Sequence, residues 1–155
     1  MKQLTLKLVI PLTVISFATF TKWWYVLPVD APDTMFSGFP LPFVCEGWHT
    51  SLSLQIFVTE FTIDLLTYFL FWLALVFCID RFLTKIIPHK ILTITLWTLT
   101  GLVIIGSGLI ASNPDNIFYV KRPFDMETME TGYKFIWQYT ERPDYYKYHP
   151  EDRHK

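Results

Sequence analysis

The stretch LLTYFLFWL, at residues 65–73, lies inside the longest apolar block of the sequence, which runs from Leu54 to Ile79. As a helix with 1.5 Å of rise per residue, this block would be about 39 Å long, whereas the hydrocarbon core of a bilayer is only ~30 Å thick. Charged residues follow it at once, beginning with Asp80 and Arg81. The pattern predicts a membrane-spanning helix at about residues 54–80, either tilted or with its first turns above the hydrocarbon.

Two shorter apolar blocks lie on either side of this one. The first, at about residues 6–26, ends in Trp23, Trp24 and Tyr25, an aromatic group typical of a membrane–water interface. The other, at residues 91–111, has the ~20-residue length of a single span. We therefore predict an all-α integral membrane fold, with three transmembrane helices in residues 1–112 and a polar C-terminal tail in residues 113–155.

The first block has an alternative interpretation as a cleaved signal peptide. Lys2 and Lys7 would form its basic region, and Ser16-Phe17-Ala18 resembles a cleavage site with small residues. The apolar and aromatic character continues beyond this site to Leu27. This continuation favours an uncleaved membrane anchor.

The composition agrees with a membrane protein and excludes some other classes. Hydrophobic residues make up 52% of the 155-residue chain and charged residues only 17%, against the roughly 25% of charged residues in a soluble domain. The formal net charge is −1 and the basic residues form no stripe, so we expect no nucleic acid as a partner. The lipid bilayer is the first partner that the sequence predicts.

The loop at residues 27–53 and the tail have their own patterns. Four prolines divide the loop, at positions 28, 32, 40 and 42, so we expect no single regular element there. In the tail, apolar residues recur at helical spacing, and this predicts a short amphipathic helix. These residues are Met126, Met129, Tyr133, Ile136, Trp137 and Thr140.

The distribution of lysine and arginine predicts the orientation. Lys2 and Lys7 precede or enter the first block, and Arg81, Lys85 and Lys90 lie between the second and third blocks, whereas residues 27–53 contain no lysine or arginine. By the positive-inside rule, the N-terminus is cytoplasmic, and the loop at 27–53 and the C-terminal tail are extracytoplasmic. An inner or plasma membrane is the default assumption for such a chain.

The two cysteines, Cys45 and Cys78, lie before and near the end of the second block. A helix between them would hold them tens of ångströms apart, beyond the reach of a disulfide. We expect two free thiols that give no zinc signal, because no Cys pair has metal spacing, and the sequence predicts no cofactor.

Glu60 and Asp64 are the main candidate site residues. They are four positions apart and so share one face of the second helix, together with Thr67 and Tyr68. An ionisable group inside a span is a functional-site hypothesis, because burying it costs about 2.5–3.5 kcal/mol. The structural alternative is an interfacial position, where the carboxylates are hydrated or paired with a cation. The candidate cations are Lys22, Lys121 and Arg122.

His49 precedes the second helix on the same side as these carboxylates. A histidine and two carboxylates are a combination that binds divalent metals or performs acid–base catalysis. The spacing matches no metal motif, so a position as a helix-cap and interface residue is the favoured interpretation of His49.

The sequence matches no family signature, so function is inferred from the arrangement alone. The first hypothesis is a non-enzymatic structural or accessory subunit that acts through a protein partner or as a homo-oligomer. Its contact surface would be the small-residue face of the third helix, with Gly101, Gly108 and Ser112. The alternatives are a proton- or ion-coupled site, or a membrane enzyme, built on Glu60, Asp64 and His49.

Overall fold

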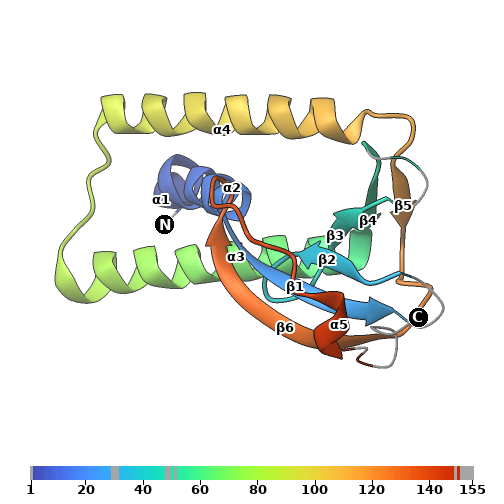
Figure 1. Ribbon diagram of the computed structural model, residues 1–155. Helices are drawn as coiled ribbons and strands as arrows, with labels where there is room; N and C mark the ends of the chain where they lie inside the picture. The colour runs from blue at the N-terminus through green and yellow to red at the C-terminus, as the bar shows by residue number, and fades with distance from the viewer. Residues whose placement is uncertain (1, 29–31, 48–49, 51, 149, 151–155) are drawn as a thin grey trace.

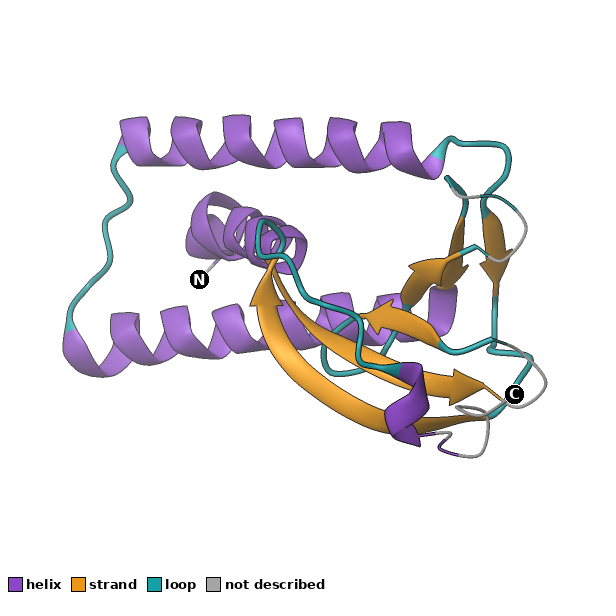
Figure 2. Cartoon of the chain, in the orientation of Figure 1, coloured by secondary structure: helices purple, strands orange, loops and turns teal. Residues whose placement is uncertain are grey.

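The computed structural model describes residues 2–28, 32–47, 50, 52–148 and 150. These residues form helices and one six-stranded sheet, so the prediction of an all-α fold is wrong and the chain is mixed α/β. Two long helices, α3 and α4, lie on opposite sides of the N-terminal helix, and each of them packs against it (Figure 1). The strands gather toward one end of this helical layer (Figure 2).

The N-terminal block is helical only in its first part. Three consecutive segments make one helix: α1 (Lys2–Leu4), the π-helical η1 (Thr5–Val9) and α2 (Ile10–Thr19). Phe20 then adopts extended backbone angles and begins strand β1 (Phe20–Pro28). The predicted span at residues 6–26 is therefore wrong, because the aromatic and β-branched residues that end the block favour a strand.

The loop between the first two apolar blocks contributes three short strands. They are β2 (Thr34–Ser37), β3 (Val44–Glu46) and β4 (Leu54–Phe57), and successive strands from β1 to β4 pair antiparallel. The four prolines lie at the end of β1 or between strands, so they limit the length of the strands but do not interrupt them. Strand β4 also removes four residues from the start of the second predicted helix.

The tail completes the same sheet from the other side. Strand β5 (Ile117–Tyr119) pairs parallel with β4, and β6 (Met126–Phe135) pairs antiparallel with the full length of β1. The sheet order is β5-β4-β3-β2-β1-β6. The predicted amphipathic helix in the tail is therefore wrong over Met126–Phe135, and the described helix after β6 is the four-residue α5 (Tyr145–Tyr148).

The two long helices agree with the spans predicted from the sequence better than the N-terminal block does. Helix α3 (Val58–Cys78) continues into the π-helical η2 (Ile79–Leu83), and α4 covers Lys90–Ala111. In the described part of the chain, the two segments Val58–Leu83 and Lys90–Ala111 are long and apolar enough to cross a membrane. The prediction of a third such helix is not supported.

Two separate hydrophobic cores hold the molecule together. The helical core joins Leu4, Leu8 and Val9 of the N-terminal helix to Val76 of α3, with Leu96 of α4 packed against it. The second core lies against the sheet and consists of Val26, Phe36, Cys45 and Phe57. Because β1–β4 come before α3 and β5–β6 come after α4, the first loop and the tail lie on the same side of the helices.

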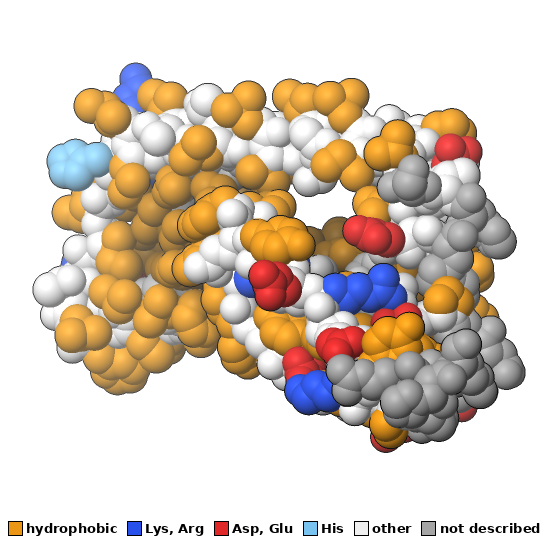
Figure 3. All heavy atoms as spheres, viewed as in Figure 1, with side chains coloured by type: hydrophobic (Ala, Val, Ile, Leu, Met, Phe, Trp, Pro, Cys, Tyr) orange, Lys and Arg blue, Asp and Glu red, His pale blue; other side chains and the backbone are white. Residues whose placement is uncertain are grey.

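Most of the surface of α3 and α4 is apolar and is not covered by the chain itself. Only 17% of the most apolar window of Val58–Leu83 and 11% of that of Lys90–Ala111 is buried. Figure 3 shows hydrophobic side chains over the helices, whereas acidic and basic side chains gather over the sheet.

Candidate functional site

The candidate site lies where the sheet meets the helices. Strand β4 passes into α3 without a loop, so Glu60 is in the first turn of the helix and Asp64 is one turn further. On the sheet side, the β2–β3 loop and the β5–β6 loop approach this turn through Leu41 and Arg122. The junction therefore brings together residues from three distant parts of the sequence.

Glu60 forms an ion pair with Arg122, one of the three cations that the sequence analysis proposed as its partner. The Arg122 Nη2 atom lies 3.2 Å from Glu60 Oε1, and the two side chains are 18% and 14% exposed. Thr59 positions the loop that carries Arg122, because its hydroxyl donates to the Val120 carbonyl at 2.5 Å. The guanidinium also lies over the Phe57 ring, 5.6 Å from its centroid.

Asp64 is fully buried, with no exposed surface. Its Oδ1 atom accepts a hydrogen bond from the Leu41 backbone N–H at 2.9 Å. The turn that presents this N–H depends on Gly38, which has a φ of 152° and whose hypothetical Cβ would lie 2.0 Å from the Leu41 carbonyl oxygen. Asp64 therefore faces the β2–β3 loop and not the exposed apolar surface of α3, as expected for a carboxylate that lipid cannot solvate.

Three buried polar atoms of this junction have no hydrogen-bond partner among the described residues. They are Glu60 Oε2, Asp64 Oδ2 and Arg122 Nε. An unpartnered buried polar atom costs about 1–3 kcal/mol, and more when the group is charged. The two carboxylate oxygens can therefore accept a proton or a hydrogen bond, and Arg122 Nε–H can donate a hydrogen bond to a water molecule or another small polar group.

The other candidate residues are not hydrogen-bonded to the carboxylates. Tyr68 is largely buried, but its hydroxyl donates to the Phe20 carbonyl at 2.8 Å. Thr67 is on the exposed side of α3 and donates to the Ile63 carbonyl. His49 lies outside the described residues, so its predicted proximity to Glu60 and Asp64 remains a prediction.

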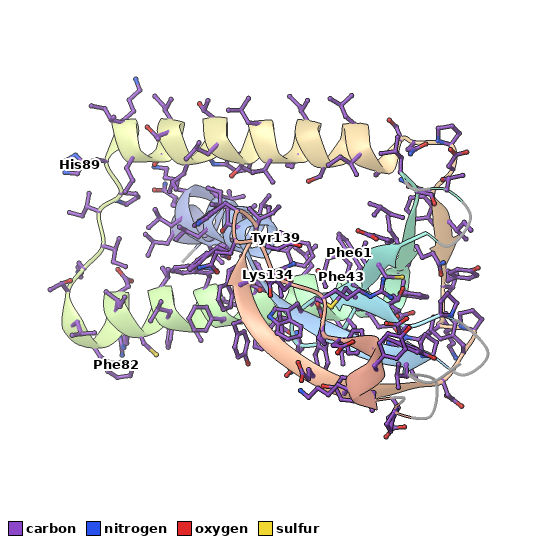
Figure 4. All side chains as sticks on the ribbon, in the orientation of Figure 1. Phe43, Phe61, Phe82, His89, Lys134 and Tyr139 are labelled. Carbon is purple, nitrogen blue, oxygen red and sulfur yellow. The ribbon has the colours of Figure 1, made fainter. Side chains whose placement is uncertain are left out.

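Aromatic rings enclose the junction on the helix side. Phe43 and Phe61 lie beside each other at the sheet end of α3 (Figure 4), with ring centroids 5.3 Å apart. Phe17 of α2 contacts both rings and also contacts Tyr68. These rings form an apolar cluster that joins α2 to the β2–β3 loop and the first turns of α3.

An apolar groove of about 320 Å³ lies nearby, between α2 and α3, but the two carboxylates do not line it. Its lining residues are Ile10, Thr13, Val14, Thr62, Leu65, Leu66 and Phe69. Because none of these residues is ionisable, the groove resembles a hydrocarbon-contacting surface more than an active-site cleft.

The two cysteines are free, as predicted. Cys45 is buried in the sheet core, and burial raises the pKa of its thiol to about 12, although the nearby Arg122 has a lowering effect. Such a thiol stays protonated and unreactive at neutral pH. No group of three potential metal-binding side chains occurs in the part of the chain that the structure describes.

A second polar cluster, on the sheet, was not identified from the sequence. The buried Tyr25 donates to Asp33 Oδ2 at 2.5 Å, and Arg142 lies 2.8 Å from Asp33 Oδ1. Burial and the hydrogen bond to Asp33 raise the pKa of Tyr25. Arg142 comes from the tail, so this cluster fastens the tail to β1. No local sequence pattern links residues 25, 33 and 142.

Comparisons with known proteins give no assignment for this arrangement. No protein-family model matches the sequence, and neither a curated protein nor a solved structure is significantly similar to the chain.

Proposed function

We propose that this chain is a small membrane-anchored protein that acts as a structural or accessory subunit. The observation that carries this proposal is the apolar surface of α3 and α4, of which so little is buried by the chain itself. Continuous apolar surfaces of this size are rare on soluble monomers, and in a membrane lipid would cover them. The N-terminal helix then packs between the two spans, and the sheet stands at one membrane surface.

The proposed orientation follows the charges. The N-terminus and the α3–α4 connection lie at the end of the helices away from the sheet (Figure 1), and this end carries Lys2, Arg81, Lys85 and Lys90. By the positive-inside rule this end is cytoplasmic, and the sheet is extracytoplasmic at a plasma or inner membrane.

The proposed contact surface for a partner subunit or a second copy is the Gly101, Gly108 and Ser112 face of α4. Added Cβ atoms at Gly101 and Gly108 would meet nothing within 4 Å. The chain itself therefore does not use this close-approach surface, which favours contact with another helix.

Membrane extraction and association measurements test the proposal. The protein should stay in the membrane fraction at alkaline pH and enter solution only with detergent; release without detergent would refute the anchor. In detergent, Gly101→Ile and Gly108→Ile should dissociate an oligomer or a co-purified partner without changing thermal stability.

Gly106→Ile is the matched control for the α4 surface. Gly106 has equally open surroundings, but it lies about 140° around the helix from Gly101. If all three substitutions leave association unchanged, or if Gly106→Ile disrupts it equally, the small-residue face is not the contact surface.

A second candidate function is a proton- or ion-coupled site at Asp64 and Glu60. The observation that favours it is the set of unpartnered buried atoms on Glu60, Asp64 and Arg122. The test is flux through vesicles that contain the purified protein and a pH- or cation-sensitive dye. Flux that Asp64→Asn abolishes would support the site, and an absence of flux from the wild-type protein would refute it.

A further inference from the structure

The end of the helices opposite the sheet carries an unbalanced positive charge. Five cations belong to the segments that meet there, namely Lys2, Lys7, Arg81, Lys85 and Lys90, against one carboxylate, Asp80. That carboxylate is used internally, because Asp80 Oδ1 accepts the Ile86 backbone N–H at 3.0 Å. All three ion pairs found among the described residues lie elsewhere: Glu60–Arg122 at the start of α3, Asp33–Arg142 between two loops, and Glu130–Lys147 between β6 and α5.

Large apolar side chains are interleaved with these cations. Phe82 is 76% exposed and Ile87 is 83% exposed. Figure 4 shows Phe82 and His89 directed away from the body of the molecule at this end. A connection that alternates exposed basic and apolar side chains suits the headgroup boundary of a membrane, where acyl chains take the apolar groups and lipid phosphates take the cations.

Two further features at this end of the helices favour the binding of an anion. Helix α4 begins at Lys90 without a side-chain N-cap, so its first backbone N–H groups and its positive dipole end face the same layer. A cavity of about 500 Å³ also opens between the N-terminal helix and the α3–α4 connection, lined by Lys2, Gln3, Leu4, Ile86, Ile87 and Pro88. The wall on the N-terminal helix carries the Lys2 ammonium group, and the wall on the α3–α4 connection is apolar. This combination suits a lipid, whose charged headgroup adjoins apolar chains.

We propose that this basic end of the helices binds anionic phospholipid headgroups. Lys2, Arg81, Lys85 and Lys90 supply the cations, and Phe82 and Ile87 insert among the acyl chains beside them. This inference rests on the membrane placement proposed above. It goes beyond that placement because a membrane anchor alone does not require the protein to prefer anionic over zwitterionic lipid.

Tryptophan quenching by brominated lipids tests the preference. The full-length protein is reconstituted in vesicles of phosphatidylcholine with phosphatidylglycerol, with bromine on the acyl chains of one lipid or the other. Trp72 and Trp97, the two of the six tryptophans that lie in the long helices, report lipid contact when the other four are replaced by phenylalanine. The two quenching curves then give the binding constant of phosphatidylglycerol relative to phosphatidylcholine. The wild-type protein should prefer phosphatidylglycerol severalfold.

The combined variant Arg81→Gln, Lys85→Gln, Lys90→Gln should lose this preference. One basic residue near an anionic surface changes binding by about fivefold, so the ratio should fall by at least that factor and approach one. All three side chains are exposed, so the fold and the thermal midpoint in phosphatidylcholine should stay unchanged. The control, Lys121→Gln with Lys134→Gln, removes two cations from the sheet end and should keep the wild-type ratio.

Two results would overturn the proposal: equal binding of both lipids by the wild-type protein, or a preference that survives in the combined variant. Failure of the membrane placement itself gives a different result, because neither brominated lipid would then quench the tryptophans.

Discussion

At the scale of single residues, the Glu60–Arg122 ion pair links α3 to the tail half of the sheet, beside the hydrogen bonds from Thr59 to the Val120 carbonyl. Both side chains are mostly buried, and each has one further polar atom without a partner. Glu60 and Asp64 were recognisable from the sequence because a pair of carboxylates in an apolar block is conspicuous. The sequence could not single out Arg122 among three possible cationic partners of Glu60. Arg122 lies 62 residues from Glu60 along the chain, and their contact depends on how the β5–β6 loop folds against α3.

We expect Arg122→Met to destabilise the protein by about 1–3 kcal/mol, because it leaves the Glu60 carboxylate buried without its cation. Adding Glu60→Gln to this variant should recover most of the loss, because the charge left without a partner is then removed. Thermal unfolding in one detergent measures both variants. Lys121→Met is the matched control and should change little, because Lys121 is the exposed neighbour in the same loop. If Arg122→Met unfolds at the wild-type temperature, the ion pair does not hold the loop.

Cys45 and Cys78 should differ in reactivity. Cys45 is buried and its pKa is raised to about 12, whereas Cys78 is exposed on α3. At neutral pH an apolar maleimide should modify one thiol per native chain, at Cys78, and both thiols in denaturant. The Cys78→Ala variant should remain unmodified until it is denatured. Rapid modification of native Cys45 would contradict its place in the sheet core.

At the scale of elements, the sequence predicted helices correctly where apolar length decides the structure. Helix α4 matches residues 91–111 closely, and α3 matches the second block apart from Leu54–Phe57. The strands were missed for two different reasons. The aromatic end of the first block resembles both an interfacial belt and a strand, and its pairing with β2 and, across about a hundred residues, with β6 selects the strand.

The tail shows the same limit of local patterns. Apolar residues between Met126 and Thr140 fit a helical period, yet Met126–Phe135 forms β6 because β1 offers it a complete row of backbone partners. Gly132 also fits this pairing, since a Cβ there would lie 2.6 Å from Trp23 Nε1. No pattern within the tail itself reveals such a long-range partner.

The attachment of α5 to β6 should depend on pH. Hydrogen bonds from Lys147 and Tyr148 lower the pKa of Glu130. Because the folded state favours the carboxylate, this stabilisation is complete above the ordinary pKa of glutamate and is lost as the pH falls through the lower value of the folded state. Amide-exchange protection of Lys147, whose N–H donates to the Asp144 backbone carbonyl, should therefore decrease in acid after correction for intrinsic rates.

The Glu130→Gln variant should have weak protection in α5 already at neutral pH and should show no further change in that acidic range. Glu127→Gln, an exposed glutamate on the same strand, serves as the control and should keep the wild-type pH profile. Identical profiles in all three proteins would show that Glu130 does not anchor the tail.

At the scale of the whole molecule, the arrangement divides into a basic helical end, an apolar middle and a sheet. The apolar middle could be predicted from the sequence, because the hydrocarbon thickness of a membrane sets the number of consecutive apolar residues that a spanning helix needs. The sheet could not be predicted in the same way, because its strands are short and come from both sides of α3 and α4. Glu60 and Asp64 lie in the predicted second helix, on α3, but the residues around them come from that unpredicted sheet.

In the proposed membrane placement, α3 and α4 cross the bilayer and hold the sheet on the side opposite the α3–α4 connection. The most direct test is labelling with a membrane-impermeant maleimide in sealed cells or right-side-out vesicles, in a background with Cys45→Ala and Cys78→Ala. A Thr128→Cys variant on β6 should be labelled from outside, and a Lys90→Cys variant should be labelled only after the membrane is opened. Equal labelling of both variants in sealed membranes would contradict this membrane placement.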